Sequence, residues 1–225
     1  GYPEAISRTT HRRRTAWGRQ YIDAIIQRDV RDVANIDRLN QLPRFLKALA
    51  HVSGQMCNYT QLGGQVGLDH KTASRYISVF EQMFLLKRVD VWTSNRLKRM
   101  VKAPKLQFID SGLLTTLVDL TPDLAEQNRS RFGNVLETFV YAELLKQTTN
   151  AEGDYQLFYY RDHDQYEVDV VAENAAGKLV GVEIKAAATI KESDLRGLKR
   201  LVSVAKDQFM LGVILYDGIE TLPLG

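Results

Sequence analysis

The chain contains 225 residues, 44% of them hydrophobic and 25% charged, which suffices for one large or two ordinary globular domains. No apolar run reaches the length of a membrane span and no signal-peptide core is present, so neither a membrane partner nor secretion is expected. The single cysteine, Cys57, excludes a disulfide framework and a cysteine-based zinc site, and it fits the reducing cytoplasm, which is the predicted location.

The net charge of +3 hides an asymmetry along the chain. Residues 1–130 hold 20 Lys and Arg against 12 Asp and Glu, whereas residues 131–225 hold 10 against 15. A basic part followed by an acidic part suggests a nucleic-acid-binding region joined to an acidic, metal-binding module. Chance segregation of surface charge explains the same counts, and composition alone does not separate the two interpretations.

Residues 1–54 are predicted to form a helical segment. The abrupt opening Gly-Tyr-Pro-Glu is interpreted as a cut inside a longer protein. Apolar residues recur at helical spacing after the basic run 11–14, and again over about residues 39–53. These residues are Trp17, Tyr21, Ile22, Ile25, Ile26, Leu42, Phe45, Leu46, Leu49 and Val52.

Residues 55–110 are predicted to form a winged helix-turn-helix. A short helix over 59–66 is followed by a tight turn and by a second helix over about 70–84, with Asp69 as its N-cap. Segments 85–92 and 105–109 are predicted to be the two wing strands. The buried stripe of the second helix is predicted to contain Ala73, Ile77, Phe80 and Phe84.

Basic and polar residues lie where this motif meets DNA. The second helix can enter a major groove, and the segment between the wing strands forms a basic tip suited to phosphate. A winged helix also serves as a protein-interaction module, and solvated surface charge explains the same residues. The predicted DNA contacts are Lys71, Ser74, Arg75, Arg96, Lys98, Arg99 and Lys102.

Residues 111–130 are predicted to be a linker with a short helix near its start, and residues 131–225 a second domain. That domain opens with a helix carrying Glu137. Near its end, a helix over 193–205, with Leu195, Leu198, Leu201 and Val202 on one side, precedes a strand over 210–216.

Two neighbouring strands carry an acid and an acid-x-lysine pair. Residues 174–177 are turn-prone, so the strand with Asp169 is expected to fold back against the strand with Glu183 and Lys185. Because strand side chains alternate, Glu183 and Lys185 share one face and Asp169 can lie beside Glu183. Two solvated residues on a half-buried strand are the better explanation of an isolated Glu-x-Lys, but the acid on the partner strand and the preceding helical Glu137 weaken that explanation.

These residue types suit divalent-metal chemistry. Mg²⁺ prefers oxygen ligands, so Asp169, Glu183 and Glu137 are the predicted ligands of Mg²⁺ or Mn²⁺. A bound metal can polarise a phosphate and activate a water molecule, and Lys185 would position the attacking water or steady the phosphorus centre. The four predicted catalytic residues are therefore Glu137, Asp169, Glu183 and Lys185.

This order of a helical Glu, a strand Asp and a strand Glu-x-Lys resembles the PD-(D/E)XK nuclease superfamily. Carried over by position, Glu137 matches the helical acid, Asp169 the first strand acid, and Glu183 with Lys185 the signature pair. Val168 stands where the name-giving motif has proline. The resemblance implies an α/β fold of the α+β type, in which a mixed sheet flanked by helices follows the helical segment and the winged helix.

Nearly the whole chain also resembles the C-terminal region of prokaryotic AAA+ (archaeal-ATPase-like) proteins, which implies an upstream ATPase module as a partner. No G-x-x-x-x-G-K-[ST] motif is present, so ATP is not expected to bind these residues. The resemblance rests on Gly-Tyr-Pro-Glu at 1–4 and on segments 27–32, 58–59, 104–106, 110–113, 136–140 and 182–185.

Two functional hypotheses follow. In the first, a DNA-binding winged helix delivers a duplex to a metal-dependent nuclease site. In the second, a non-catalytic regulatory or interaction module couples the ATPase to DNA or a protein and keeps the nuclease fold only as a scaffold. Docking of the basic tip on an acidic protein surface is a third, weaker interpretation.

Overall fold

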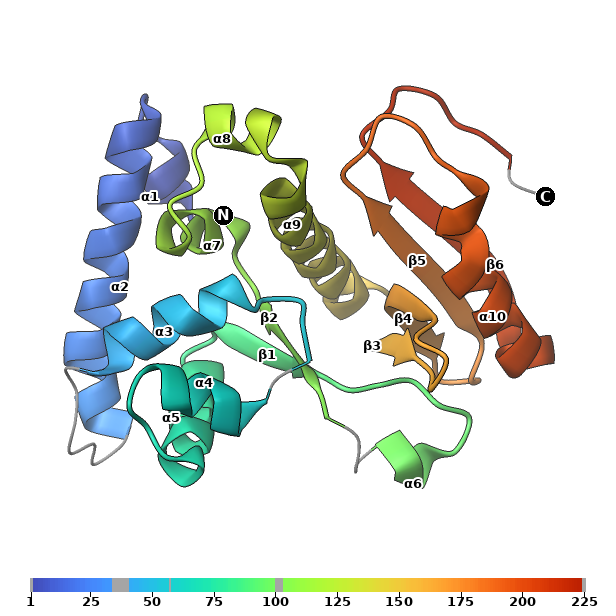
Figure 1. Cartoon of the computed structure of the whole chain (residues 1–225), viewed down its shortest axis with the longest axis horizontal. Coiled ribbons are helices and arrows are strands. Elements are labelled where there is room, and N and C mark those ends of the chain that lie inside the picture. The colour runs from blue at the N-terminus through green and yellow to red at the C-terminus, as the bar shows by residue number, and fades with distance from the viewer. Residues whose placement is uncertain (1, 34–40, 57, 100–102, 224–225) are drawn as a thin grey trace. The chain divides into compact units, whose positions relative to one another are not determined.

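The structure is a computed structural model that describes residues 2–33, 41–56, 58–99 and 103–223 (Figure 1). The chain divides into two compact units. Unit 1 contains Gly1–Arg88 and Ala103–Gln127, and unit 2 contains Val89–Lys102 and Asn128–Gly225. Helices, a two-stranded sheet and a mixed four-stranded sheet are present among the described residues, which confirms the predicted α+β fold class.

Unit 1 is mainly helical. The third helix, α3, begins with Pro43 in its first turn and buries Leu42 and Phe45 completely, because their spacing puts them on one side. The elements of this unit are α1 (Pro3–Ile6), α2 (His11–Val33), α3 (Leu42–His51), α4 (Tyr59–Gln65), α5 (His70–Gln82), β1 (Leu86–Val89), β2 (Lys105–Phe108), α7 (Ser111–Leu117) and α8 (Pro122–Gln127). Strands β1 and β2 form the two-stranded sheet.

The predicted helix-turn-helix elements are present as α4 and α5. Asp69 is the N-cap of α5, as predicted, and its carboxylate accepts the Thr72 backbone N–H at 2.9 Å. The turn between the helices contains Gly67 at φ +72, a conformation that favours glycine. Whether these elements act as a DNA-binding winged helix stays a proposal.

Two expectations for unit 1 were wrong. Phe84 is 75% exposed because α5 ends at Gln82 and the chain turns there at φ +55, and Tyr76 lies in the buried stripe instead. Residues 111–127 do not form a linker, since α7 packs with α2 and α3. Gly18 of α2 makes this approach possible, because a Cβ there would lie 2.7 Å from the Thr116 hydroxyl oxygen.

Unit 2 is built around the four-stranded sheet. Its strand order is β3-β4-β5-β6, in which the first three strands are antiparallel and β6 is parallel to β5. Its further elements are α6 (Arg96–Arg99), α9 (Arg129–Asn150), β3 (Tyr155–Arg161), β4 (Glu167–Asn174), β5 (Leu179–Lys185), the 3₁₀ turns η2 (Glu192–Leu195) and η3 (Lys206–Gln208), α10 (Arg196–Ala205) and β6 (Phe209–Tyr216).

The hairpin between β4 and β5 forms where it was predicted. Gly177 adopts φ +74 and its N–H donates to the Asn174 carbonyl at 2.8 Å. The Asn174 side chain also accepts the Lys178 N–H at 2.9 Å, which closes the turn. This local turn fixes which residues of the two strands lie opposite each other.

The sheet of unit 2 is covered by α9 on one face and α10 on the other (Figure 1). Tyr141 of α9 packs with Val182 and Ile184, whereas Leu198 and Leu201 of α10 pack on the opposite face. Val202, predicted to lie in the α10 stripe, is 43% exposed, and Ala205 is buried. The i, i+3, i+7 spacing of Leu198, Leu201 and Ala205 explains this correction.

The segment after β1 belongs to unit 2. The Tyr159 N–H donates to the Asp90 carbonyl at 3.1 Å, and the Trp92 N–H donates to the Tyr159 carbonyl. The predicted wing strand 85–92 is therefore divided, since residues 86–89 form β1 and residues 90–92 run along β3. The predicted basic tip contains the short helix α6, and residues 100–102 of the tip lie outside the described residues.

Candidate active site

The hairpin brings Asp169 and Glu183 together. Val170 pairs with Val182, and continuing that register by one residue places Asp169 opposite Glu183. The Asp169 carboxylate accepts the Ile184 backbone N–H at 2.7 Å. On its other side β4 carries an extra residue, because Asp169 and Val170 together face Tyr159. Bulges of this kind redirect side chains and are common beside active sites.

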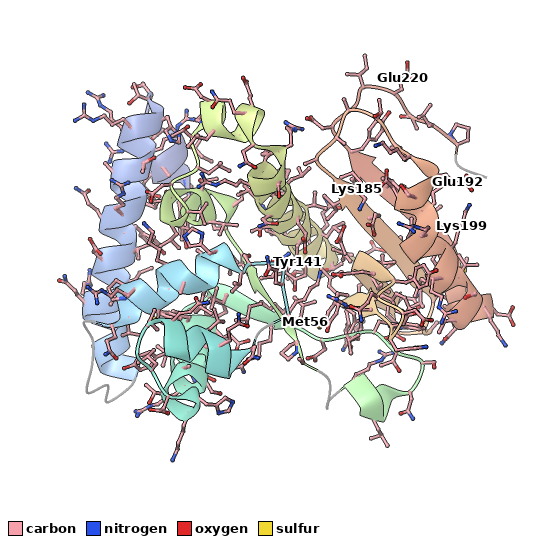
Figure 2. All side chains as sticks on the ribbon, in the orientation of Figure 1. Met56, Tyr141, Lys185, Glu192, Lys199 and Glu220 are labelled. Carbon is pink, nitrogen blue, oxygen red and sulfur yellow. The ribbon has the colours of Figure 1, made fainter. Side chains whose placement is uncertain are left out.

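Alternation along β5 sets the face of the site. A Cβ at Gly181 would lie 2.8 Å from Leu198 of α10, whereas Val182 and Ile184 pack on the α9 side. Glu183 and Lys185 therefore share the α10 face, as the sequence predicted. Figure 2 labels Lys185 on β5.

Glu183 is a buried acid with one unsatisfied oxygen. The residue is only 7% exposed, and Oε1 accepts from the Lys185 ammonium at 2.7 Å. Oε2 is buried and has no hydrogen-bond partner within the described part of the chain. Burial, followed by the charge of Asp169, raises the pKa of Glu183 to about 7 against the opposing effect of Lys185. A buried acceptor without a partner costs about 1–3 kcal/mol, so this carboxylate is suited to a cation.

Lys185 stays a cation in this environment. Burial alone would lower its pKa, but the hydrogen bond and the charge of Glu183, together with the charge of Asp169, outweigh burial and raise the pKa. The half-buried ammonium can therefore stabilise negative charge that develops beside the carboxylates.

An open polar pocket of about 400 Å³ lies over Glu183 and Lys185. The chain after β3 forms one wall, and the turn into α10 forms the other. The lining residues are Asp164, Gln165, Tyr166, Glu167, Glu183, Lys185, Ser193, Asp194, Arg196 and Gly197. The helix over 193–205 was predicted, but its approach to the segment after β3 was not, because that contact joins residues far apart in the sequence.

Glu137 is placed differently from the other three predicted catalytic residues. It is half-buried on α9, whose apolar side chains pack against the other face of the sheet. Neither Glu137 nor Asp169 is one of the residues that line the pocket. The structure thus brings Asp169, Glu183 and Lys185 together, and the role of Glu137 as a third metal ligand stays a prediction.

The donor set at this site fits a hard divalent cation. Asp169 and Glu183 lie on paired strands, where the charge of Asp169 acts on Glu183, and the partnerless Oε2 of Glu183 is an available acceptor. A second acidic group, Asp162, His163 and Asp164, has ligand atoms within 4.8 Å of one another. Asp162 and Asp164 already accept from Arg200, so this group is tied into an ion-pair network.

The predicted DNA contacts divide into three groups. Lys71 and Arg75 are exposed on α5, and Ser74 is partly buried between them. Arg96 and Lys98 lie on α6, where only their backbone is described, and Lys102 lies outside the described residues. Arg99 is a separate case.

Arg99 is buried, which corrects its assignment as a phosphate contact. It is 8% exposed, and its guanidinium donates to both carboxylate oxygens of Glu173 and to the Thr93 carbonyl. The guanidinium carbon lies 4.8 Å from the Phe158 ring centre and 5.6 Å from the Trp92 ring centre. The Arg99 guanidinium therefore pairs with residues of unit 2 and does not face solvent, where a phosphate would bind.

These features define a two-unit α+β protein whose C-terminal unit carries a buried acid–acid–lysine cluster. By sequence comparison, the chain belongs to the family described as Domain of unknown function (DUF8612), whose model matches residues 1–124. Residues 132–225 match a second model, Domain of unknown function (DUF4143), which is typically a C-terminal region of AAA-ATPase-like proteins.

Two curated mycobacterial proteins are similar to the chain. They are the uncharacterized protein Rv2008c of Mycobacterium tuberculosis and the uncharacterized protein Mb2031c of Mycobacterium bovis, each 26% identical over 189 residues. The aligned region covers 84% of this chain and 42% of each relative, so the chain spans less than half the length of these relatives. No solved structure matches the chain. None of the helices described here has the length and apolar content that a bilayer-spanning helix needs.

Proposed function

We propose that unit 2 is a divalent-metal-dependent phosphodiesterase module that cleaves nucleic acid. The observation that carries the proposal is the buried, partnerless Oε2 of Glu183 beside Asp169 and Lys185. A buried carboxylate that has a hydrogen-bond partner for only one oxygen, and that lies next to a second acid, lowers the stability of the fold. Such arrangements are typical of functional sites. The PD-(D/E)XK resemblance of the same residues supports this choice of chemistry.

The residues divide the work as follows. Asp169 and Glu183 would hold Mg²⁺ or Mn²⁺ through their carboxylates, and Glu137 is a further candidate ligand. The bound cation would supply Lewis-acid activation of a phosphate and of a water molecule. Lys185 would hold the phosphate by its positive charge and hydrogen-bond the attacking water, since its ammonium remains protonated beside Glu183.

Unit 1 is proposed to bind DNA through α5. Lys71 and Arg75 are exposed one turn apart on this helix, which fits contact with a phosphate backbone. The link of the second matched family with AAA-ATPase-like proteins supports an ATPase module as the partner in a longer chain. ATP hydrolysis itself is not assigned to these residues.

Cleavage of labelled DNA in the presence of Mn²⁺ tests the proposed activity. Glu183→Gln and Lys185→Ala should each lower the rate by at least about 100-fold, the usual effect of losing a group that stabilises the transition state. Glu192→Gln and Lys199→Ala are matched controls, because these residues form an exposed pair at 3.1 Å in the same unit (Figure 2). They should retain the wild-type rate.

Two results would contradict the nuclease. Cleavage that survives Glu183→Gln would point to a contaminant, and no cleavage of any DNA with Mn²⁺ or Mg²⁺ would favour the non-catalytic coupling module.

DNA binding is tested separately by fluorescence anisotropy. Lys71→Gln and Arg75→Gln should each reduce the salt dependence of duplex binding by about one counterion. An unchanged salt dependence in both variants would exclude α5 as the binding helix.

A further inference from the structure

The pocket over Glu183 and Lys185 extends beyond these two residues. Its floor contains Glu183 and Lys185, while Tyr166 lies on the wall after β3 and Arg196 lies on the wall at the start of α10. Tyr166 is 36% exposed and Arg196 is exposed, so both present a surface to a ligand. Neither residue has a role in the proposed bond cleavage.

The Tyr166 wall is held in place by α10. Arg200 donates through Nε to Asp162 at 2.7 Å and through Nη2 to Asp164 at 3.2 Å. Asp162 also accepts the Tyr166 backbone N–H at 3.0 Å, and the Arg200 guanidinium carbon lies 5.7 Å from the Tyr166 ring centre. These contacts fix the backbone of the loop at Tyr166 and place the Tyr166 ring beside the Arg200 guanidinium.

The opposite wall approaches closely. A Cβ at Gly197 would lie 1.8 Å from the Glu167 carbonyl oxygen, so only glycine allows α10 to begin this near β4. The open pocket of about 400 Å³ is near the lower end of the range for small-molecule sites, which suits a single nucleotide.

The pocket lining contains two cations, Lys185 and Arg196, and four acids, which are Asp164, Glu167, Glu183 and Asp194. Phosphates are therefore favoured beside Lys185 and Arg196. A base is favoured beside Tyr166, where its flat face can stack and nearby carboxylates can accept from its amino group.

We propose that this pocket takes one unpaired nucleotide, with the base on Tyr166 and an adjacent phosphate on Arg196. The substrate class of the site is then single-stranded or locally unpaired nucleic acid rather than continuous duplex. This inference rests on the proposed function for the cleavage step, but the binding step stands on the pocket alone.

Binding is measured with the full chain in EDTA, where cleavage cannot occur. The probes are a fluorescein-labelled single strand of about a dozen nucleotides and the corresponding blunt duplex. Tyr166→Ala should weaken single-strand binding by about 5- to 100-fold, the range for losing one stacked base, and leave duplex binding unchanged. Tyr155→Ala is the matched control, because Tyr155 is 41% exposed on the same unit and lies outside the pocket.

Arg196→Gln should reduce the salt dependence of single-strand binding by about one counterion. Lys199→Gln, on the same helix and outside the pocket, should leave that dependence unchanged. The inference is overturned if Tyr166→Ala binds the single strand like wild type, or if Tyr155→Ala loses as much affinity. Loss of the cleavage activity alone, with Tyr166-dependent binding intact, would remove the proposed nuclease and leave the nucleotide pocket.

Discussion

Two buried glutamates on neighbouring strands of unit 2 have opposite surroundings. Glu173 of β4 is 6% exposed and Glu183 of β5 is 7% exposed, and each faces one basic side chain. Both oxygens of Glu173 accept from the planar guanidinium of Arg99. Only one oxygen of Glu183 accepts from Lys185, whose ammonium is a point donor.

The comparison shows that burial alone does not distinguish a structural acid from a functional one. The Arg99–Glu173 pair is complete, and it fastens the segment after β1 to the four-stranded sheet. Glu183 keeps an unused acceptor beside Asp169 and faces a pocket. An incomplete buried pair is costly to the fold, which is the reason to assign it a ligand.

The largest expected effect comes from breaking the complete pair. Arg99→Met should lower the free energy of unfolding by about 3–5 kcal/mol, because Glu173 is left as a buried charge without its partner. Combining it with Glu173→Leu should recover most of that loss. Arg129→Met is the control, since its partner Asp217 is 52% exposed and the pair should contribute less than about 1 kcal/mol. Urea unfolding measures all three, and equal costs for Arg99→Met and Arg129→Met would refute the structural role.

The incomplete pair should reveal itself in the pH dependence of stability. The folded state raises the pKa of Glu183 from 4.5 to about 7, so it binds this proton more tightly than the unfolded chain does. Stability from this group is present below pH 4.5 and is lost as the pH rises to 7, by about 3 kcal/mol at most. Glu183→Gln should remove that slope relative to wild type in urea titrations between pH 4.5 and 8. Glu192→Gln should keep it, and a slope that persists without Glu183 would assign it to another group.

A divalent cation bound at Asp169 and Glu183 should raise the free energy of unfolding. Mn²⁺ at about 100 times its dissociation constant should raise the free energy of unfolding by about 2.7 kcal/mol. Asp169→Asn and Glu183→Gln should abolish the increase, and Glu192→Gln should retain it. Because the ligand must be deprotonated, Mn²⁺ affinity measured by calorimetry should rise with pH up to about 7. An equal increase in stability in all variants would mean that the ion binds elsewhere.

Widening the pocket should have the smallest effect on stability. Gly197→Ala forces α10 away from the Glu167 carbonyl and should cost about 1–3 kcal/mol, the range for overpacking. Gly64→Ala is the counterpart, because a Cβ there meets nothing within 4 Å and should stabilise α4 by up to about 1 kcal/mol. Thermal unfolding compares the two. Equal behaviour of both variants would show that the close approach of α10 does not shape the pocket.

Much of the candidate site could be predicted from the sequence because its parts depend on near neighbours. The turn at residues 174–177 and the two-residue alternation along β5 place Asp169, Glu183 and Lys185 together. The pocket walls could not be predicted, because Tyr166 and Arg196 are brought there by Arg200 and Gly197. Those contacts join segments with no shared pattern.

Sequence by itself therefore determined the fold class, the Asp69 cap, the β4–β5 hairpin and the face that Glu183 and Lys185 share. These follow from hydrogen bonds and periodicities that act within a few residues. Only the tertiary structure decided that Arg99 forms a buried ion pair with Glu173, 74 residues away, and that Oε2 of Glu183 has no hydrogen-bond partner among the described residues. Burial and pairing depend on which distant segment arrives beside a side chain, and local sequence does not encode that.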